Sequence, residues 1–337
     1  MFWREQRKQF SVRNRAMTNN IVSANPQVSV IMPSYNTAQL IAASLDSVLQ
    51  QTFSDFEIIV VNDGSPDTID LEKILQPYQS KIVYLKQPNK RAAGARNTAI
   101  AKARGEFLAF LDSDDIWLPD HLAFQMQLFE ENPALDLVYS NCISANNPTH
   151  PQEFMSRCPS DGSATFLSLV RETCQIPIST VVARKNTLVR AGLFDESLPR
   201  CDDYDMWLRA AFHGAKIGYT RRVQARLTDG RPGSLGVSSV RMTEAYWKIL
   251  QKMDQTLPLT DSDRDVVQKR STEAHGLYLL EEGKVNLRQG RFPEAKSLFS
   301  KANSYLRSPK VSLVLLGLSI APSATRSLAS LVERFRG

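Results

Sequence analysis

Three aspartates follow an apolar run, residues 107–111, that reads as a buried strand: Asp112, Asp114 and Asp115. Asp112 and Asp114 are two residues apart, so their side chains can converge on one side of the chain. A hard divalent cation such as Mg²⁺ or Mn²⁺ would relieve the repulsion, because it takes few carboxylates and fills its other positions with phosphate oxygens and water. The pattern therefore predicts a cation site that also engages phosphate. The alternative, an acidic cap for the helix beginning near Pro119, accounts for one aspartate but not for three.

Asp63 ends another β-branched run, in the sequence Asn62-Asp63-Gly64-Ser65. An Asp-Gly pair is typical of a hairpin turn, but the segment that follows has a helical pattern. An aspartate at the carboxyl end of a parallel strand lies in the crevice where such sheets bind ligands, and its oxygens can accept a base N–H such as that of uracil. The first strand ends in Pro33-Ser34-Tyr35-Asn36 without a GxGxxG sequence, which disfavours a dinucleotide-dependent dehydrogenase.

Two further segments carry charge at the start of a predicted helix. Residues 89–97 place Lys90, Arg91 and Arg96 where the helix dipole disfavours cations, so an anionic nucleotide diphosphate would offset the unfavourable positive charge; a solvated basic loop is the alternative.

Residues 201–209 place three aspartates, at 202, 203 and 205, at a helix start, where capping explains part of the pattern. One that reaches the crevice could accept a proton from a hydroxyl, and the sequence alone does not choose among them.

These residues must be positioned by an alternation of short β-branched runs and helical patterns. We expect strands at 28–32, 57–61, 81–85, 106–111, 135–139, 179–183 and 216–219. Helices are expected at about 37–51, 67–78, 93–104, 119–131 and 203–213. The fold class is therefore α/β, with a mostly parallel central sheet flanked by helices.

The chain divides into three regions by composition. A basic arm over residues 1–25 precedes an α/β domain over 26–240, whose halves are about 26–140 and 141–240. Residues 228–240 are rich in Gly, Ser and Pro and predict a loop. From 241 to 337 the pattern is helical, with one hairpin resembling a tetratricopeptide repeat. Its last segment, 323–336, is either a helix packed on the main domain or a basic amphipathic helix on an anionic membrane surface.

Length and composition exclude several classes of protein. The 337 residues are 42% hydrophobic and 23% charged, which is ordinary for a globular protein, and the net charge of +6 is mild. The sequence shows no signal peptide and no apolar stretch of the roughly 20 residues that cross a bilayer. Four cysteines without a CxxC pair fit a reducing cytosol. Outside the amino-terminal arm no basic, aromatic face indicates a nucleic-acid partner.

Five segments taken together carry a family resemblance: VSVIMPSYN, EIIVVNDGS, KRAAGARN, FLAFLDSDD and DDYDMWLR. In this order and at these spacings they resemble the family 2 glycosyltransferases of GT-A (Rossmann-like) fold, over about residues 28–240. The resemblance implies an inverting, metal-dependent hexosyltransferase that moves a sugar from a nucleotide diphosphate, usually a UDP-sugar, to an acceptor hydroxyl. It also implies surface polysaccharide or lipid-linked glycan synthesis in the cytoplasm, at the inner face of the cytoplasmic membrane, with peripheral membrane contact.

The resemblance also implies roles for individual residues. Pro33, Tyr35 and Asp63 would hold the base and ribose, and Arg96 would approach the nucleotide. Asp112 and Asp114 would form the DxD motif, with Asp114 binding Mn²⁺ or Mg²⁺. Asp203 would be the catalytic base that deprotonates the acceptor.

Position 231 departs from the pattern of many relatives. These close the site with a segment like YRxHPGSLS, whereas the residue before Pro232 here is Arg231. The last metal contact of the protein is therefore left open, and Arg231, being always charged and fork-shaped, could clamp the diphosphate instead.

Two alternative functions, a non-catalytic scaffold and a nucleotidyltransferase, fit the sequence less well. A catalytically degenerate scaffold would recruit partners through the helical tail, but the aspartates that the chemistry needs are intact. A nucleotidyltransferase shares the architecture but usually shows a Gly-rich loop after the first strand, and this sequence has none. Nothing in 141–202 or 228–240 identifies the sugar or the acceptor.

Overall fold

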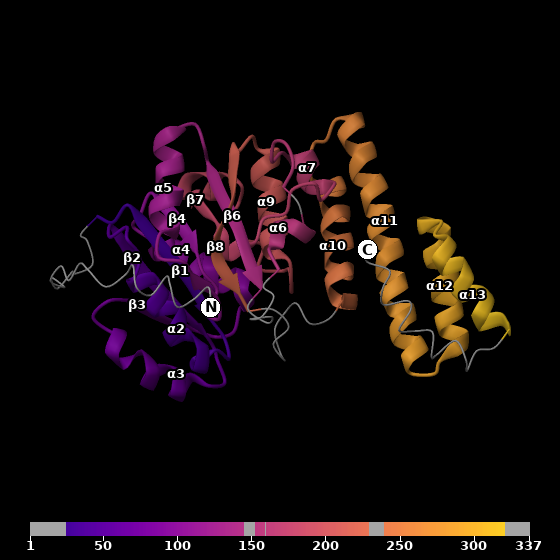
Figure 1. Cartoon of the computed structure of the whole chain (residues 1–337), viewed down its shortest axis with the longest axis horizontal. Coiled ribbons are helices and arrows are strands. Elements are labelled where there is room, and N and C mark those ends of the chain that lie inside the picture. Colours follow the sequence, from indigo (N-terminus) through magenta and orange to yellow (C-terminus); the bar gives the residue numbers. More distant parts are fainter. Residues whose placement is uncertain (1–24, 145–151, 159, 229–238, 321–337) are drawn as a thin grey trace, which may run out of the picture.

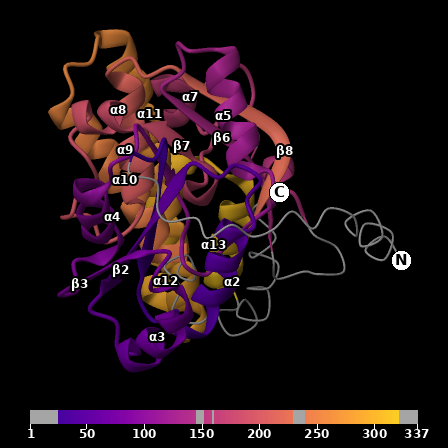
Figure 2. The same ribbon diagram turned by 90° about the vertical axis from the view of Figure 1, so that its left-hand side faces the viewer.

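The computed structural model describes residues 25–144, 152–158, 160–228 and 239–320. These residues form an α/β part built on one sheet, followed by a row of long helices that extends to one side (Figure 1). Figure 2 views the same chain from the side of the α/β part, with the helical region behind it.

The sheet has eight strands in the order β3-β2-β1-β4-β7-β6-β8-β5. Their bounds are β1 Val28–Ser34, β2 Phe56–Asp63, β3 Val83–Gln87, β4 Phe107–Phe110, β5 Ile116–Trp117, β6 Leu137–Ser144, β7 Val182–Arg184 and β8 Ile217–Leu227. The strands β3, β2, β1 and β4 are parallel neighbours, as are β6 and β8. Antiparallel pairs join β4 to β7, β7 to β6 and β8 to β5. The predicted α/β class with a mostly parallel sheet and a carboxy-terminal helical region is confirmed.

Helices cover both faces of the sheet because side chains alternate along each strand. Val30 and Val60 point to a core shared with α2 (Ala38–Leu49), α3 (Thr68–Leu75) and α5 (His121–Glu131). Ile31 and Ile59 point to the opposite core, shared with α4 (Arg91–Lys102) and α9 (Asp202–Phe212). The two faces are mostly apolar on the central strands, as expected for parallel strands that are buried on both sides, and the buried polar pair Ser29 and Glu57 is joined by a hydrogen bond of 2.7 Å.

Short elements complete this part of the fold. They are the 3₁₀ turns η1 (Gln76–Tyr78) and η2 (Ile178–Thr180) and the helices α6 (Phe154–Arg157), α7 (Phe166–Val170) and α8 (Lys185–Arg190). The sequence predicted η1 only as the end of a helix over 67–78, and η2 takes the first two residues of the strand predicted at 179–183. The other short helices and β5 were not predicted, and β8 runs eight residues beyond its predicted end, to Leu227. Elements of two to six residues have too few positions for a periodic pattern.

The helical region consists of α10 (Ser239–Thr256), α11 (Asp261–Arg288), α12 (Phe292–Leu306) and α13 (Pro309–Ile320). Helix α10 and the first part of α11 share the core of α9, through buried residues such as Ile249 and Val267. The rest of α11 packs with α12 and α13 around Phe299, which is fully buried. Among the described residues, no helix is both long and apolar enough to cross a membrane.

Helices α11 and α12 approach closely because a glycine faces an aromatic ring. A β-carbon at Gly283 would lie 2.6 Å from Cε1 of Phe299.

We expect Phe299→Ala to leave a cavity that costs about 3–5 kcal/mol of local stability. Amide hydrogen exchange should then accelerate in α11 to α13, while exchange in the β1–β4 core stays unchanged. Leu313→Ala on α13, where the side chain is 69% exposed, is the control and should change exchange little. Equal effects of the two substitutions would contradict this packing.

Candidate active site

A cleft of about 1230 Å³ opens where the central strands end. The register pairs Ser34 with Asn62 and Ile31 with Phe110, so the residues after β1, β2 and β4 meet at one edge of the sheet. This edge is where parallel α/β sheets bind ligands. The cleft is lined by most of the predicted site residues, namely Pro33, Tyr35, Asp63, Asp112, Asp114 and Asp203.

A buried arginine joins the two sides of the cleft. Arg96 of α4 donates from Nη2 to Oδ1 of Asp112 at 2.7 Å and from Nη1 to Oδ2 of Asp202 at 2.6 Å. Asp112 follows β4, whereas Asp202 is the first residue of α9, so this one side chain ties together segments that are 90 residues apart in the sequence. The guanidinium fork suits two carboxylates in a way that a lysine ammonium does not.

Arg96 itself is only 4% exposed and is not among the residues that line the cleft. Burial alone would lower the pKa of Arg96, but the charges of Asp112, Asp202 and Asp203 outweigh this effect and raise it. The sequence led us to expect Arg96 to approach the nucleotide. In the structure its guanidinium binds the carboxylates of Asp112 and Asp202, and its approach to a nucleotide stays a prediction.

The loop carrying the aspartates is held by buried hydroxyl groups. Ser179 of η2 donates to Oδ2 of Asp115 at 2.6 Å and accepts from the backbone N–H of Asp112 at 3.1 Å. On the other side, the hydroxyls of Thr37 and Ser113 are 2.8 Å apart. Sequence reasoning missed Ser179 and Thr37, because a serine or threonine in a loop carries no local signal of a partner more than sixty residues away.

The three aspartates of this loop have different surroundings. Asp115 is buried, and burial together with the charges of Asp112 and Asp114 raises its pKa well above the usual value. It also accepts a hydrogen bond from the backbone N–H of Thr228 at 2.8 Å, so its contacts are internal. Asp112, Asp114 and Asp115 all line the cleft, and because the hydrogen bonds of Asp115 are internal, we expect Asp112 and Asp114 to be the two that face a ligand.

These oxygens fit a hard divalent cation in chemical type. Within the described residues, however, no group of three or more His, Cys, Asp or Glu side chains is arranged to hold a metal ion. A cation at Asp114 would therefore draw most of its ligands from elsewhere, which is what Mg²⁺ and Mn²⁺ do when they bind phosphates.

Asp63 lies at the floor of the cleft as the last residue of β2. Its Oδ1 accepts from the side chain of Gln87 at 2.6 Å and from the backbone N–H of Lys90 at 2.8 Å. The strand that follows, β3, is parallel to β2, so Asp63-Gly64 is not a hairpin turn. Gly64 has φ +63° and a β-carbon there would meet Asn89 N at 2.7 Å, which explains why a glycine is needed.

The basic segment before α4 borders the same cleft. Arg91, exposed, lines it and has a left-handed φ of 63°, a strained backbone for a residue other than glycine. Cys201, just before α9, is also left-handed, with φ 54°. Both left-handed residues therefore lie at the start of a helix that contributes a side chain to the cleft, Arg91 in α4 and Asp203 in α9.

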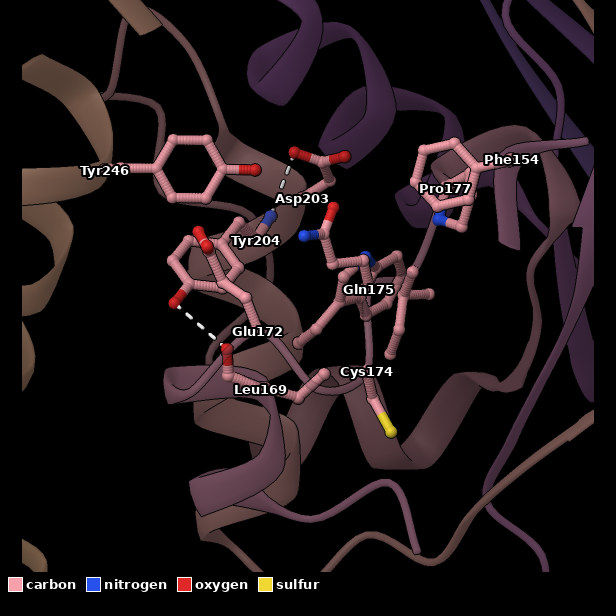
Figure 3. Close-up of a pocket in the computed structure, with 11 residues that line it drawn as sticks. Phe154, Leu169, Glu172, Cys174, Gln175, Pro177, Asp203, Tyr204 and Tyr246 are labelled. Atoms are coloured by element: carbon pink, nitrogen blue, oxygen red, sulfur yellow. Dashed lines mark hydrogen bonds between the residues drawn. The ribbon is translucent and has the colours of Figure 1, made fainter. Parts of the chain in front are cut away.

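Three aspartates begin α9, and the structure separates them. Asp202 is bound by Arg96, and Asp205, which is fully buried, is bound by Arg209 and by Lys252. Only Asp203 lines the cleft, and its Oδ1 accepts from the backbone N–H of Tyr204 at 2.9 Å (Figure 3). Burial, followed by the charge of Asp202, raises the pKa of Asp203 to about 6, although Arg96 acts in the opposite direction. A carboxylate with this pKa is ionised at pH 7 and is a stronger base than an ordinary aspartate.

Some predicted features lie outside the described residues. These are Arg231, most of the basic arm over 1–25 and the segment 323–336.

The sheet order, the aspartates at the strand ends and the acidic start of α9 are those of an α/β protein of GT-A type. The family described as Glycosyl transferase family 2 matches residues 29–195. The chain is also 37% identical over 182 residues to "UDP-Glc:alpha-D-GlcNAc-diphosphoundecaprenol beta-1,3-glucosyltransferase WfgD" of Escherichia coli, covering 54% of this chain and 68% of that protein. The chain therefore belongs to glycosyltransferase family 2.

Solved structures share the fold over nearly the whole chain. S. aureus TarS 1–349 in complex with UDP-GlcNAc is 19% identical with a TM-score of 0.59, covering 92% of each chain. The mannosyltransferase PcManGT from Pyrobaculum calidifontis, in complex with GDP-Man and Mn²⁺, is 20% identical with a TM-score of 0.61, covering 98% of this chain and 90% of that one. At these identities the likeness establishes the fold alone.

Removing the guanidinium of Arg96 should destabilise the protein. Arg96→Met leaves Asp112 and Asp202 close together and without their shared cation, and breaking a buried pair in this way costs about 3–5 kcal/mol. The matched control is Arg221→Met, because Arg221 forms an ion pair with Asp161 in which both side chains are more than 60% exposed. Such a pair contributes under about 1 kcal/mol. Urea denaturation measures both, and equal stability of the two variants would contradict a structural role for Arg96.

Proposed function

We propose that this protein is an inverting glycosyltransferase that moves a sugar from a UDP-sugar to the hydroxyl of a glycan acceptor. The observation that carries the proposal is the position of Asp203. This partly buried base with a raised pKa lines the same cleft as Asp63, Asp112 and Asp114, on the α9 side.

The donor half of the cleft suits a nucleotide diphosphate. Asp63, Pro33 and Tyr35 would hold the base and ribose, and Tyr35, half exposed, offers a ring face for the base. Arg91, at the start of α4, offers a charge to the phosphates, where the helix dipole also favours an anion. The relative WfgD has UDP-Glc in its name, and TarS has been solved with UDP-GlcNAc, which supports a uridine donor.

We further propose that Asp114 binds a divalent cation, with Asp112 beside it in the DxD motif. When bound, this cation would offset the negative charge that builds on the departing diphosphate. PcManGT was solved with Mn²⁺, which supports the choice of metal. Arg231 stays a candidate for a second contact to the diphosphate.

The transfer would be a single displacement. Asp203 accepts the proton of the acceptor hydroxyl while that oxygen forms a bond to the anomeric carbon. The bond between the anomeric carbon and the diphosphate oxygen breaks, and the electron pair leaves with the diphosphate. Because attack and departure occur on opposite faces, the anomeric configuration inverts.

The acceptor is proposed to be a lipid-linked sugar at the inner face of the cytoplasmic membrane, used in surface glycan synthesis. The name of WfgD specifies an acceptor of this class, GlcNAc on diphosphoundecaprenol. A degenerate scaffold is not favoured, because all four aspartates needed for the chemistry line the cleft.

Calorimetric titration with UDP in Mn²⁺ and in EDTA tests the donor site. We expect wild-type protein to bind UDP only with the metal, and Asp114→Asn to weaken binding about 10–100-fold. Asp203→Asn should bind UDP within 2-fold of wild type but lose transfer from UDP-glucose by about 10²–10⁴-fold, because the base is missing.

Asp70→Asn is the matched control for both aspartates, since Asp70 is an exposed residue of α3 and undergoes the same change of charge. It should behave as wild type in both assays. Failure of UDP, GDP and dTDP to bind wild-type protein would overturn the proposed function, and full activity of Asp203→Asn would move the base to another residue.

The pH dependence of transfer provides a separate test. Below its pKa of about 6 Asp203 is protonated and cannot accept a proton, so kcat/KM should rise through pH 6 and level off above pH 7. An ordinary aspartate would place this rise near pH 4. A rate that stays constant down to pH 4.5 would show that the base is a group with an unshifted pKa.

A further inference from the structure

A second, smaller cavity of about 190 Å³ adjoins the cleft at the catalytic aspartate (Figure 3). The two cavities share Phe154, Pro177 and Asp203. None of the proposed donor residues lines the smaller cavity. Its other walls come from α7, α9, α10 and the segment between α7 and η2, namely Leu169, Glu172, Cys174, Gln175, Ile176, Tyr204, Trp207 and Tyr246.

Polar groups converge at the junction of the two cavities. In Figure 3 the carboxylate of Asp203, the hydroxyl of Tyr246 and the amide of Gln175 face the same space. Within the described part of the chain, neither Tyr246 nor Gln175 makes a hydrogen bond through its side chain. Burial raises the pKa of Tyr246 well above its usual value, so this hydroxyl keeps its proton and can donate. The indole N–H of Trp207, another lining residue, is buried and also lacks a partner among the described residues.

The rest of the lining is apolar and aromatic. Phe154 and Pro177 form one wall, and the rings of Tyr204 and Tyr246, with centroids 4.7 Å apart, form another. Glu172 is already bound by Arg270, so it offers no charge that needs a ligand. Apolar walls with a few hydrogen-bonding groups suit a neutral ring that carries hydroxyls, whereas the charge of Asp203 would repel an anion.

The position of Tyr246 is fixed by an ion-pair network. Lys252, which also belongs to α10, donates to Asp205 of α9 at 2.5 Å and to Asp195 at 2.7 Å. Because Asp205 is fully buried, this contact anchors α10 against α9. Tyr246 lies six residues before Lys252 on α10, about 1.7 turns, and its ring packs on that of Tyr204 in the first turn of α9.

We propose that this cavity is the acceptor subsite, that it takes a neutral pyranose ring, and that Tyr246 and Gln175 are positioning residues that orient the nucleophilic hydroxyl toward Asp203. The inference rests on the proposed function, since it assigns the acceptor side of the same site. It places part of the acceptor specificity in α10, a helix outside the matched residues 29–195. The donor sugar is assigned to the larger cleft, where Asp112 and Asp114 lie.

The first test separates acceptor from donor effects. Transfer from UDP-glucose to a synthetic GlcNAc-diphospho-lipid is measured for Tyr246→Phe and Gln175→Leu. Each variant should raise the acceptor KM about 3–10-fold, the loss of one hydrogen bond, and leave the UDP Kd within 2-fold of wild type. The control is Tyr305→Phe, because Tyr305 is a 40% exposed tyrosine on α12. An unchanged acceptor KM, or a UDP Kd that rises in parallel, would overturn the assignment.

The second test needs no turnover and no knowledge of the natural acceptor. Saturation-transfer NMR is recorded with the methyl glycosides of GlcNAc, glucose, galactose and mannose, in the presence of UDP. At least one should bind to wild-type protein and lose its signal in Tyr246→Ala but not in Tyr305→Ala. If UDP binds but none of the four glycosides does, the subsite is wrong while the proposed function stands. If UDP itself does not bind, the proposed function fails first.

Discussion

The arrangement of the site depends on one buried cation between two carboxylates. Arg96 must lose its water to lie at 4% exposure, and a desolvated guanidinium is tolerated only because Asp112 and Asp202 both bind it. Each carboxylate in turn depends on the arginine for its own neutralisation. Since α4, the end of β4 and the start of α9 each supply one member, the ion-pair triad sets the distance between the end of β4 and the start of α9.

The triad occupies two of the aspartates in the acidic segments, Asp112 and Asp202, and other contacts occupy Asp205 and Asp115. Six aspartates lie in the two acidic segments, and all have nearly the same ionisation in water. Asp202 and Asp205 are occupied by cations, Asp112 has Arg96 beside it, and Asp115 is enclosed by internal hydrogen bonds. Asp203 is buried beside the negative charge of Asp202 and forms no ion pair within the part of the chain that the structure describes, so its pKa moves to about 6. A direct ion pair would lower the pKa of a carboxylate, so the raised pKa of Asp203 depends on its forming none among the described residues.

The sequence predicted the parts of this site that are local. The strands β1, β2 and β4 are mostly apolar runs, and polar residues at the end of such a run lie at the sheet edge, which located Asp63, Asp112 and Asp114. The partners of these residues were not predictable in the same way. Ser179 and Tyr246 come from segments distant in the sequence, and only the folded chain brings them to Asp112 and Asp203. The sequence placed Arg96 correctly near the start of α4. Its burial depends on Asp202 of α9, and the residues of α4 alone do not show that α9 packs there.

The helical region shares a hydrophobic core with the α/β part of the protein. The core beneath α9 includes Ile249 of α10 and Val267 of α11, and Lys252 neutralises Asp205 in that core. The family match ends at residue 195, before both Asp203 and Tyr246, whereas Pro33, Asp63 and Asp114 all lie within it. A nucleotide is the same molecule for many enzymes of one family, so its binding residues can be shared, but each acceptor differs. If the proposed roles hold, placing the acceptor-side residues on helices that pack as one unit with α9 would let this wall of the cleft vary without disturbing the strand ends proposed to hold the nucleotide.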